Sequence, residues 1–432
     1  MARAEGIGLG LLGMGTVGAG VAQVLQDKAS VFKERVGKPL HIRRVLVRDR
    51  AKARQVRLPE GVLTTDAKAV LQDPTVHIVI EVMGGDEPAH TYIKEALARG
   101  KHVVTANKEV ISKYGPSLTA LARKNGVRLM YEASVGGGIP LIAPFQNDLI
   151  ANNVKSVEAI INGTTNYILT RMAQEGLDFG AALKQAQDLG YAEPDPANDI
   201  QGTDAAYKLA ILATLAFHTT VLPKDVYQEG ISNLSAKDFR YARELGYAIK
   251  LLAIAKEEKQ AVQARVHPAF VPLDWLLSKV DGVFNAVQVE GDLVGRVLFY
   301  GRGAGAMPTS SAIIADVINI AGDMVQGTGL RPDFRMDHGK RLLPMAEVVS
   351  RYYIRMSVKD QPGVLAKIAT VLGDEQISIA SVIQKETDAR AQTAEIVIMT
   401  HPATEAHVQR ALKRLTSLNV VGEIGNFIRV EG

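Results

Sequence analysis

Cysteine is absent from this sequence of 432 residues. The chain therefore cannot form disulfide bonds, thiolate metal sites or a thioester intermediate. The sequence also lacks an apolar stretch long enough to span a membrane, and no secretory apolar region follows Met1. We therefore expect a cytoplasmic protein without a membrane partner.

Charge of one sign is also scarce, because the formal net charge is +4 and no long basic run is present. This balance does not indicate a nucleic-acid partner. Hydrophobic residues make up 47% of the chain and charged residues 22%, which is ordinary for a soluble globular protein. A chain of this length is expected to form two or three domains, each with its own core.

The first motif is a glycine-rich turn between a short apolar strand at 7–12 and a helix. Gly13 permits the tight turn, Gly15 lets the backbone approach a pyrophosphate, and Gly18 lets the helix pack on the strand. The helix N-terminus then offers free N–H groups to the phosphates. The pattern predicts a dinucleotide site, contacted by Gly13, Gly15, Thr16, Val17 and Gly18.

The next strand, at 42–47, ends in a charged segment that bears on the choice of cofactor. An acid at this point would bind the ribose 2′-hydroxyl of NAD, whereas an arginine suits the 2′-phosphate of NADP. Both types are present, as Arg48 and Asp49. Because Arg48 comes first after the strand, we expect NADP, with NAD as the alternative.

Strands at 77–82, 102–105 and 127–131 alternate with helices, which predicts a parallel doubly wound sheet. Ligands of such sheets bind at the carboxyl ends of the strands. Lys108 lies at one of these ends, just after Thr105-Ala106-Asn107. It is either a surface charge or a group that contacts cofactor and substrate, and we favour the second role.

The segment from Gly190 to Lys208 concentrates acids beside an apolar run. Two prolines place Glu193 on an extended loop, since proline fixes φ and disfavours a helix. A helix is predicted after Gly202, and it brings Asp204 and Lys208 to one face because they are four residues apart. The segment by itself fits an exposed ion pair as well as an active site.

A run of three glycines before Pro140 follows Glu132. Such an irregular backbone can turn several carbonyl groups inward, and with one nearby carboxylate it could form a cage for a hard cation. A hinge between domains explains the same residues equally well. The residues alone leave both interpretations open.

The middle of the chain predicts a strand at 157–162, a helix whose first turn is capped by Thr164 and Thr165, and strands at 262–271 and 287–300. An apolar helix through 313–320 is expected to return to the first domain. Glycine, proline and charges at 326–347 indicate a linker. The tail predicts the order βαββαβ, which is ferredoxin-like.

Taken together, the motifs resemble homoserine dehydrogenase over nearly the whole chain, and the tail resembles an ACT domain. The resemblance rests on long motifs in the right order: the glycine loop at 8–18, Thr105-Ala106-Asn107-Lys108, the glycine run at 132–140, Asn162-Gly163-Thr164-Thr165-Asn166-Tyr167, the segment 190–208, and Gly303-Ala304-Gly305 with Pro308-Thr309. It implies a Rossmann-like doubly wound domain at 1–140, completed by about 305–325, an α+β catalytic and dimerisation domain at 141–304, a linker at 326–350 and a regulatory domain at 351–432.

The resemblance also implies an activity and residue roles. The family interconverts L-homoserine and L-aspartate 4-semialdehyde with NAD(P) in threonine and methionine biosynthesis. Lys208 would be the proton donor and acceptor, with Lys108 beside it at the reacting end. The remaining implied contacts are substrate binding by Glu193, Asp204 and Asp199, cofactor contacts from Gly190 and Gly303, and a sodium or potassium site at Glu132, Val135, Gly137 and Ile139.

Three other functions compete with this one. A semialdehyde dehydrogenase that acts through a thioester is excluded by the absence of cysteine. A cyclic-imine reductase on the same fold, or a sensor of nucleotide and amino acid without turnover, stays open. The resemblance implies threonine as inhibitor through the tail, so removal of residues after Glu347 is expected to leave a threonine-insensitive enzyme if the tail is not needed for assembly. We expect a homodimer or homotetramer.

Overall fold

The computed structural model describes residues 6–329, 336, 339–388 and 392–432. They form two compact units. Unit 1 comprises Met1–Lys155, Tyr207–Lys224 and Val289–Gly339, and unit 2 comprises Ser156–Ala206, Asp225–Gln288 and Lys340–Gly432. The linker expected at 326–350 lies partly outside the described residues, and its described part contains the short strand β13 (Arg341–Leu342).

Unit 1 contains a six-stranded sheet in the order β3-β2-β1-β4-β5-β6, in which every neighbouring pair is parallel. The connections change direction between β1 and β4, which makes this point the switch at which such sheets bind ligands. The predicted doubly wound fold is therefore confirmed. The strands are β1 (Ile7–Leu12), β2 (Leu40–Leu46), β3 (Leu63–Thr64), β4 (Ile78–Glu81), β5 (His102–Thr105) and β6 (Leu129–Met130).

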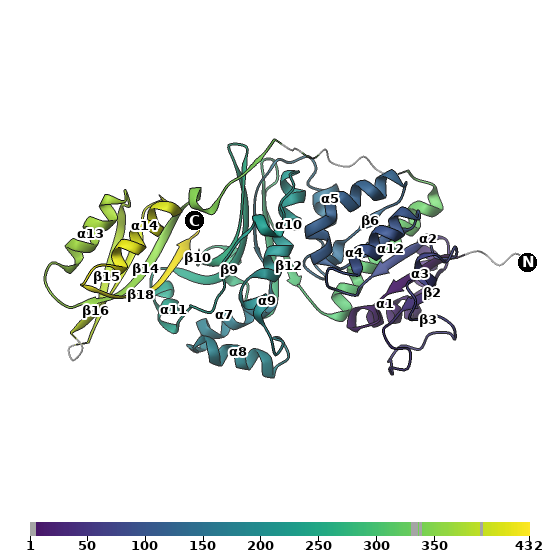
Figure 1. Ribbon diagram of the computed structural model, residues 1–432, viewed down its shortest axis with the longest axis horizontal. Coiled ribbons are helices and arrows are strands. Elements are labelled where there is room, and N and C mark those ends of the chain that lie inside the picture. Colours follow the sequence, from purple (N-terminus) through teal and green to yellow (C-terminus); the bar gives the residue numbers. More distant parts are fainter. Residues whose placement is uncertain (1–5, 330–335, 337–338, 389–391) are drawn as a thin grey trace, which may run out of the picture. The chain divides into compact units, whose positions relative to one another are not determined.

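Helices cover both faces of this sheet (Figure 1). Successive strand residues point to opposite faces, so Leu11 packs among α1, α2 and α12 while Leu12 packs among α3, α4 and α5. Helix α12 is far from α1 in the sequence but packs against it, because the apolar face of α12 belongs to the same hydrophobic core as α1 and α2. The helices are α1 (Thr16–Asp27), α2 (Ala29–Val36), α3 (Lys68–Leu71), α4 (Ala89–Ala98), α5 (Lys108–Lys124), α6 (Ile142–Asn147) and α12 (Ala306–Gln326).

Unit 2 is built on a mixed sheet whose strands run in the order β11-β7-β9-β10-β18-β14-β16-β15. Helices α7 and α11 pack against β9 and against each other. Helix α10 (Thr203–Phe217) begins in unit 2 and continues in unit 1. The other elements before the tail are β7 (Val154–Ile160), α7 (Gly163–Glu175), α8 (Phe179–Asp188), α9 (Ala197–Ile200), β8 (Tyr227–Gln228), α11 (Ala236–Glu244), β9 (Tyr247–Glu258), β10 (Ala261–Pro272) and β11 (Phe284–Gly291).

Two local expectations need correction in this region, and one strand was not predicted. The strand expected at 287–300 is divided by a turn at 292–294 into β11 and β12 (Gly295–Arg302). Strand β9 was not expected, although it pairs with β10 along its whole length. The cap of α7 is Asn162, whose side chain accepts a hydrogen bond from the N–H of Thr165, so both threonines lie inside the first turn.

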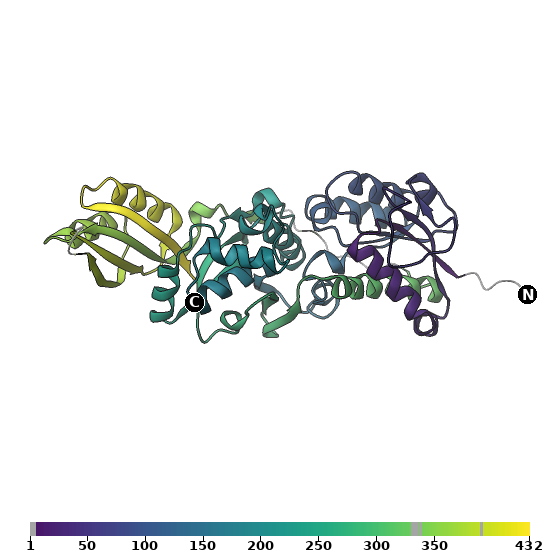
Figure 2. The same ribbon diagram turned by 90° about the horizontal axis from the view of Figure 1, so that it is seen from below.

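The tail has the predicted order βαββαβ, and the ferredoxin-like fold is confirmed (Figures 1 and 2). Its two helices and its strands enclose one hydrophobic core. The elements are β14 (Val349–Lys359), α13 (Val364–Asp374), β15 (Ile379–Asp388), β16 (Thr393–Thr400), β17 (Ala403–Thr404), α14 (Glu405–Thr416) and β18 (Val421–Val430), and the short 3-10 helices of the chain are η1 (Glu132–Ser134), η2 (Pro223–Asp225), η3 (Leu276–Lys279) and η4 (Met345–Glu347).

The tail is joined to the rest of unit 2 by backbone hydrogen bonding. Strand β18 runs antiparallel to β14 of the tail and parallel to β10, with Ala269 opposite Arg429 and Phe270 opposite Val430. The tail therefore extends the sheet of unit 2. Among the described residues, no helix combines the length and the apolar character that crossing a membrane requires.

Candidate active site

The glycine loop has the geometry that a dinucleotide site needs. Gly13 has φ of 106°, and a Cβ there would lie 2.9 Å from the carbonyl oxygen of Val82. A Cβ on Gly18 would lie 2.4 Å from the oxygen of Gly13, so only glycine allows α1 to start so close to the turn. Gly15 caps α1 and is open on its outer side, with no atom within 4 Å of a Cβ there. Its amide and those of Thr16 and Val17 begin a helix whose first N–H groups suit phosphate.

The charged segment after β2 lies at the same edge of the sheet. Arg48 follows the strand and is exposed, as is Asp49. Asp49 accepts a hydrogen bond from the N–H of Ala51, and its carbonyl accepts one from Arg54. The acid is thus used to shape the local loop, while the Arg48 side chain extends into solvent at the edge where a ribose would lie.

A buried carboxylate supports the start of α5, where Lys108 lies. Glu81 ends β4 with no exposed area, and it accepts hydrogen bonds from Thr105 Oγ1 at 2.6 Å and from the N–H of Met83 at 2.7 Å. Thr105 Oγ1 in turn accepts a hydrogen bond from the N–H of Asn107, the cap of α5. Burial raises the pKa of the Glu81 carboxyl, and the hydrogen bond from Thr105 opposes this shift. These contacts fix the backbone directly before Lys108.

Lys208 lies on α10 within unit 1. The preceding residue, Tyr207, has its ring 5.8 Å from Nζ of Lys113, which belongs to α5. Lys113 also pairs with Asp86 at 2.8 Å, in the loop after β4. Lys208 is half-buried, as is Lys108 at the start of α5. Tyr207 of α10 therefore lies near Lys113 of α5, the helix that carries Lys108.

The glycine run forms a tight loop that packs against the second glycine-rich turn. Gly136 and Gly137 both have left-handed backbone, with φ of 73° and 57°. A Cβ on Gly137 would lie 2.6 Å from the carbonyl oxygen of Gly303, so these two segments are in close backbone contact. The Glu132 carboxylate accepts hydrogen bonds from three successive N–H groups, Leu141, Ile142 and Ala143, at the start of α6.

In unit 2, one side-chain amide joins two of the predicted substrate-binding acids. Nδ2 of Asn162 donates to Oδ1 of Asp199 at 2.7 Å and to Oδ2 of Asp204 at 2.8 Å. Asn162 is 6% exposed and Asp204 7% exposed. The amide fixes the direction of both carboxylate groups, as a site for a substrate ammonium requires.

The loop of Gly190 and Glu193 is held to the same helix start. Thr164 Oγ1 donates to the carbonyl oxygen of Tyr191 at 2.7 Å. The ring of Tyr191 also contacts that of Tyr167, with centroids 4.9 Å apart. Gly190 has φ of 75°, and both Gly190 and the Glu193 side chain are exposed. The predicted loop is therefore present, with Glu193 extending outward from it.

The predicted site residues thus fall into two groups, one in each unit, and α10 carries Asp204 and Lys208 one helical turn apart. Two residues that organise these groups, Asn162 and Glu81, were not predicted. Asn162 had a signal, since asparagine before Gly-Thr-Thr is a good helix cap. Glu81 had only a weak one, an acid inside an otherwise apolar strand.

Three protein-family profiles match this chain. The profile described as homoserine dehydrogenase, NAD binding domain, matches residues 13–132, and the homoserine dehydrogenase profile matches residues 140–318. The ACT domain profile matches residues 352–420. A homoserine dehydrogenase of Synechocystis is 46% identical, covering 98% of this chain and 99% of its own length.

The chain belongs to the homoserine dehydrogenase family. A homoserine dehydrogenase of Bacillus subtilis is 40% identical and covers 99% of this chain and 99% of its own length. Among solved structures, a homoserine dehydrogenase from Thiobacillus denitrificans has a TM-score of 0.92 at 42% identity, covering 98% of both chains. A hyperthermophilic archaeal homoserine dehydrogenase solved with NADPH has a TM-score of 0.64 at 27% identity, covering 75% of this chain and 99% of its own.

Family membership identifies residues 13–132 as an NAD-binding domain and the protein as an NAD(P)-dependent dehydrogenase. The tail is an ACT domain. The individual roles of the site residues are not decided by these similarities, and they stay predictions.

The hydrogen bonds that link Glu81, Thr105 and Asn107 can be tested by substitution of Thr105. In Thr105→Val the methyl group replaces Oγ1, so the buried N–H of Asn107 loses its acceptor and Glu81 loses a donor. We expect the free energy of unfolding to fall by about 1–3 kcal/mol, the usual cost of an unsatisfied buried polar group. Lys108 is expected to act at the reacting end, where a small displacement of its side chain is costly. We therefore expect kcat to fall by up to ~10²-fold.

Thr105→Ser is the matched control, because it keeps the hydroxyl group and loses only a methyl group. Its kcat should stay within about threefold of the wild type, since the hydrogen bonds are retained. Thermal unfolding and steady-state kinetics of both variants would decide the question. Equal losses in the two variants would mean that packing of the methyl group, and not the hydroxyl, matters at this position.

Proposed function

We propose that this protein oxidises L-homoserine to L-aspartate 4-semialdehyde and catalyses the reverse reduction, as a step in threonine and methionine biosynthesis. The observation that supports the substrate most directly is the pair of carboxylates on one amide, Asp199 and Asp204 on Asn162. An amino-acid substrate presents an ammonium group, and two fixed carboxylates provide the complementary charge. Glu193 would be the third acid of this set.

Lys208 is proposed as the group that exchanges a proton with the substrate oxygen. Hydride transfer to an aldehyde carbon creates an alkoxide, and a cation within hydrogen-bond distance stabilises this charge and supplies the proton. Helix geometry sets Lys208 one turn beyond Asp204, so the ammonium end and the reacting end of a short substrate would both be addressed from α10. Lys108, at the start of α5, would assist at the reacting end.

The nicotinamide cofactor, when bound, supplies or accepts the hydride. The glycine loop at Gly13, Gly15 and Gly18 would hold its phosphates, and Gly190 and Gly303 would make further contacts. We propose NADP as the preferred form, because the exposed Arg48 can pair with a 2′-phosphate while Asp49 is engaged in its own loop.

A monovalent cation, sodium or potassium, is proposed at the glycine run. Within the described part of the chain, no N–H or O–H group donates to the carbonyl oxygens of Val135, Gly137 or Ile139. These oxygens are therefore available as ligands for a hard cation. The Glu132 carboxylate already accepts three N–H groups, which leaves about one of its four lone-pair positions. The carbonyls would consequently provide most of the coordination.

Regulation and assembly are proposed from the ACT domain and from the family resemblance. The ACT domain supports feedback inhibition by an amino acid, and threonine, an end product of the pathway, is the proposed effector. Assembly into a homodimer or homotetramer and a cytoplasmic location are proposed from the same family resemblance.

The decisive experiment follows cofactor reduction while the purified protein oxidises L-homoserine with NADP⁺ or NAD⁺, each with and without threonine. We expect turnover with homoserine, a higher kcat/KM with NADP⁺, and a lower rate with threonine. Reduction of a cyclic imine in preference to aspartate semialdehyde would contradict the proposed substrate. Threonine binding in calorimetry without any turnover would instead identify a sensor.

A further inference from the structure

One buried arginine of the ACT domain binds carboxylates on both sides of the junction between β18 and β10. Arg429 has a side chain only 1% exposed. Its Nε and Nη2 donate to Glu405 of the ACT domain at 2.9 and 2.6 Å. Its Nη1 donates to Glu229, which precedes α11 in the catalytic part of unit 2, at 2.8 Å. Burial by itself lowers the pKa of Arg429. The carboxylates of Glu405 and Glu229 outweigh this effect and raise the pKa above its usual value, so the guanidinium stays charged.

The Glu229 end of this ion pair is fixed by several contacts. Tyr227 Oη donates to Oε2 of Glu229 at 3.0 Å and accepts a hydrogen bond from Arg429 at 3.2 Å. The N–H of Glu229 donates to the carbonyl of Val266 in β10 at 2.8 Å. Glu229 is thus held between the catalytic sheet and the ACT domain.

The two residues after Glu229 contact the turn that separates Asp199 from Asp204. The N–H of Ile231 donates to the carbonyl of Ile200 at 3.0 Å. A Cβ on Gly230 would lie 2.4 Å from the same oxygen, so the two backbones are in direct contact. Residues 229–231 therefore restrain the position of this turn.

The turn also contacts the same segment through Gly202. This residue has φ of 85°, and a Cβ there would lie 3.1 Å from Val266 and 3.6 Å from the carbonyl oxygen of Glu229. Gly202 immediately precedes α10, which carries Asp204. The turn is consequently confined by residues 229–231 and by β10.

We propose that Arg429 and Glu229 are positioning residues for the substrate site. Their ion pair holds residues 229–231, which set the position of the 200–202 turn and hence the separation of Asp199 and Asp204 on the Asn162 amide. The conformation of the ACT domain is thereby transmitted to the affinity for the amino-acid substrate. This inference rests on the proposed function, in which these two acids bind the substrate ammonium.

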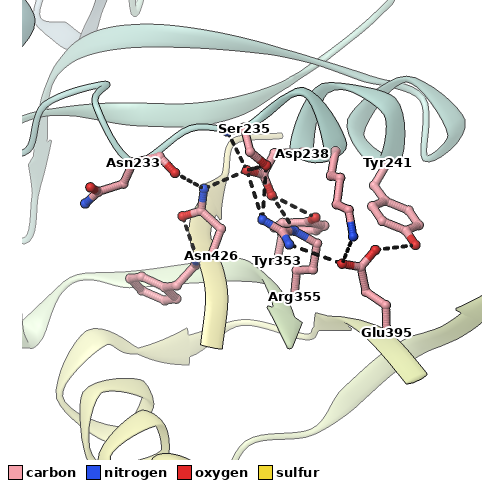
Figure 3. A network of polar contacts seen from close by, with 10 residues as sticks. Asn233, Ser235, Asp238, Tyr241, Tyr353, Arg355, Glu395 and Asn426 are labelled. Atoms are coloured by element: carbon pink, nitrogen blue, oxygen red, sulfur yellow. Dashed lines mark hydrogen bonds and ion pairs between the residues drawn. The ribbon is translucent and has the colours of Figure 1, made fainter. Parts of the chain in front are cut away.

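A second set of contacts binds residues 233–238, which follow in the same segment, to the ACT domain (Figure 3). Arg355 of β14 donates to Asp238 of α11 at 2.8 Å and to Ser235 at 3.1 Å. Asn426 of β18 donates to the carbonyl of Asn233 and to Asp238. The segment 227–241 therefore has one side bound to the ACT domain and, at residues 230–231, the other side bound to the turn of the substrate site.

Glu229→Gln is the informative variant, because it leaves no buried charge unpaired. Arg429 retains Glu405, whereas substituting Arg429 would leave Glu405, 4% exposed, without its cation and would endanger folding. The matched control is Glu244→Gln in α11. Glu244 pairs with Lys385 of the ACT domain at 2.8 Å and is 38% exposed, against 33% for Glu229, but it is remote in sequence from residues 229–231.

With the full-length protein, we expect Glu229→Gln to raise the KM for L-homoserine roughly 5-fold or more, the lower end of typical site-to-site coupling. We expect kcat and the KM for NADP⁺ to change less than about twofold, and Glu244→Gln to leave all three unchanged. Hydrogen–deuterium exchange of residues 196–204 should accelerate in Glu229→Gln alone, because the turn loses its support.

An unchanged KM for homoserine in Glu229→Gln would overturn the proposal, and so would an equal rise in both variants. Unchanged exchange at 196–204 would also overturn it. If the wild-type protein does not oxidise homoserine, the proposed function fails. The exchange comparison still tests the mechanical link, because it requires no substrate.

Discussion

Lys208→Ala is expected to lower kcat for homoserine oxidation by ~10²–10⁴-fold, the usual contribution of a positioned acid–base group. The variant removes the cation and the proton carrier together from the middle of α10. Cofactor affinity should change little, since the glycine loop that binds the phosphates lies on β1 and α1 and is untouched. Steady-state kinetics and NADPH titration by fluorescence would measure the two quantities separately.

Lys208→Arg separates the two roles of this side chain. Arginine keeps the positive charge but does not release its proton in the accessible pH range. If proton transfer is the main contribution, the arginine variant should be nearly as slow as the alanine variant. If charge stabilisation of the alkoxide is the main contribution, the arginine variant should recover much of the activity. A near-normal kcat in Lys208→Ala would refute the role of Lys208 altogether.

Removal of all residues after Glu347 is expected to prevent folding of unit 2 and not merely to abolish inhibition. The deletion removes β18 from the edge of β10 and leaves buried charges unpaired. Arg265, with a side chain 3% exposed, loses Glu431 at 2.7 Å. Asp238, with no exposed side chain, loses Arg355 at 2.8 Å.

Losing the partner of a buried charge typically costs ~3–5 kcal/mol, while whole domains are stable by only ~5–15 kcal/mol. We therefore expect the truncated chain to be insoluble or to lack a cooperative thermal transition. An archaeal homoserine dehydrogenase covers 75% of this chain with 99% of its own length, so a quarter of this chain has no counterpart in that structure. We expect this chain to need the tail for folding because the tail pairs its buried charges, Arg265 and Asp238.

A repaired truncation provides the control. Replacing Arg265 by leucine and Asp238 by asparagine in the shortened chain removes the unpaired charges, and asparagine can still accept a hydrogen bond from Ser235 at the start of α11. This variant should regain part of its solubility, as measured by the yield of monodisperse protein in gel filtration. A soluble, active enzyme from the unrepaired truncation would show that the junction is dispensable.

The nucleotide-binding half could be predicted from the sequence because its determinants are local. The change from strand to helix periodicity, with Gly13 and Gly18 at the required spacing, lies within one short segment. The need for glycine at Gly18 arises in the same segment, because a Cβ there would lie 2.4 Å from the oxygen of Gly13. Lys108 could be assigned to the ligand-binding edge because parallel strands all end at that edge. The ferredoxin-like fold of the tail could be predicted in the same way, from the order of strand and helix patterns in its sequence.

The substrate half depended on contacts between distant residues. Asn162 meets Asp199 and Asp204 from 37 and 42 positions away, and no local pattern encodes that meeting. The pairing of β18 with β10 and the ion pair between Arg429 and Glu229, 200 residues apart, are likewise absent from any local signal. Periodicity and turn residues specify which elements form. Which elements become neighbours depends on side-chain packing and charge pairing across the folded chain, and these are settled only in three dimensions.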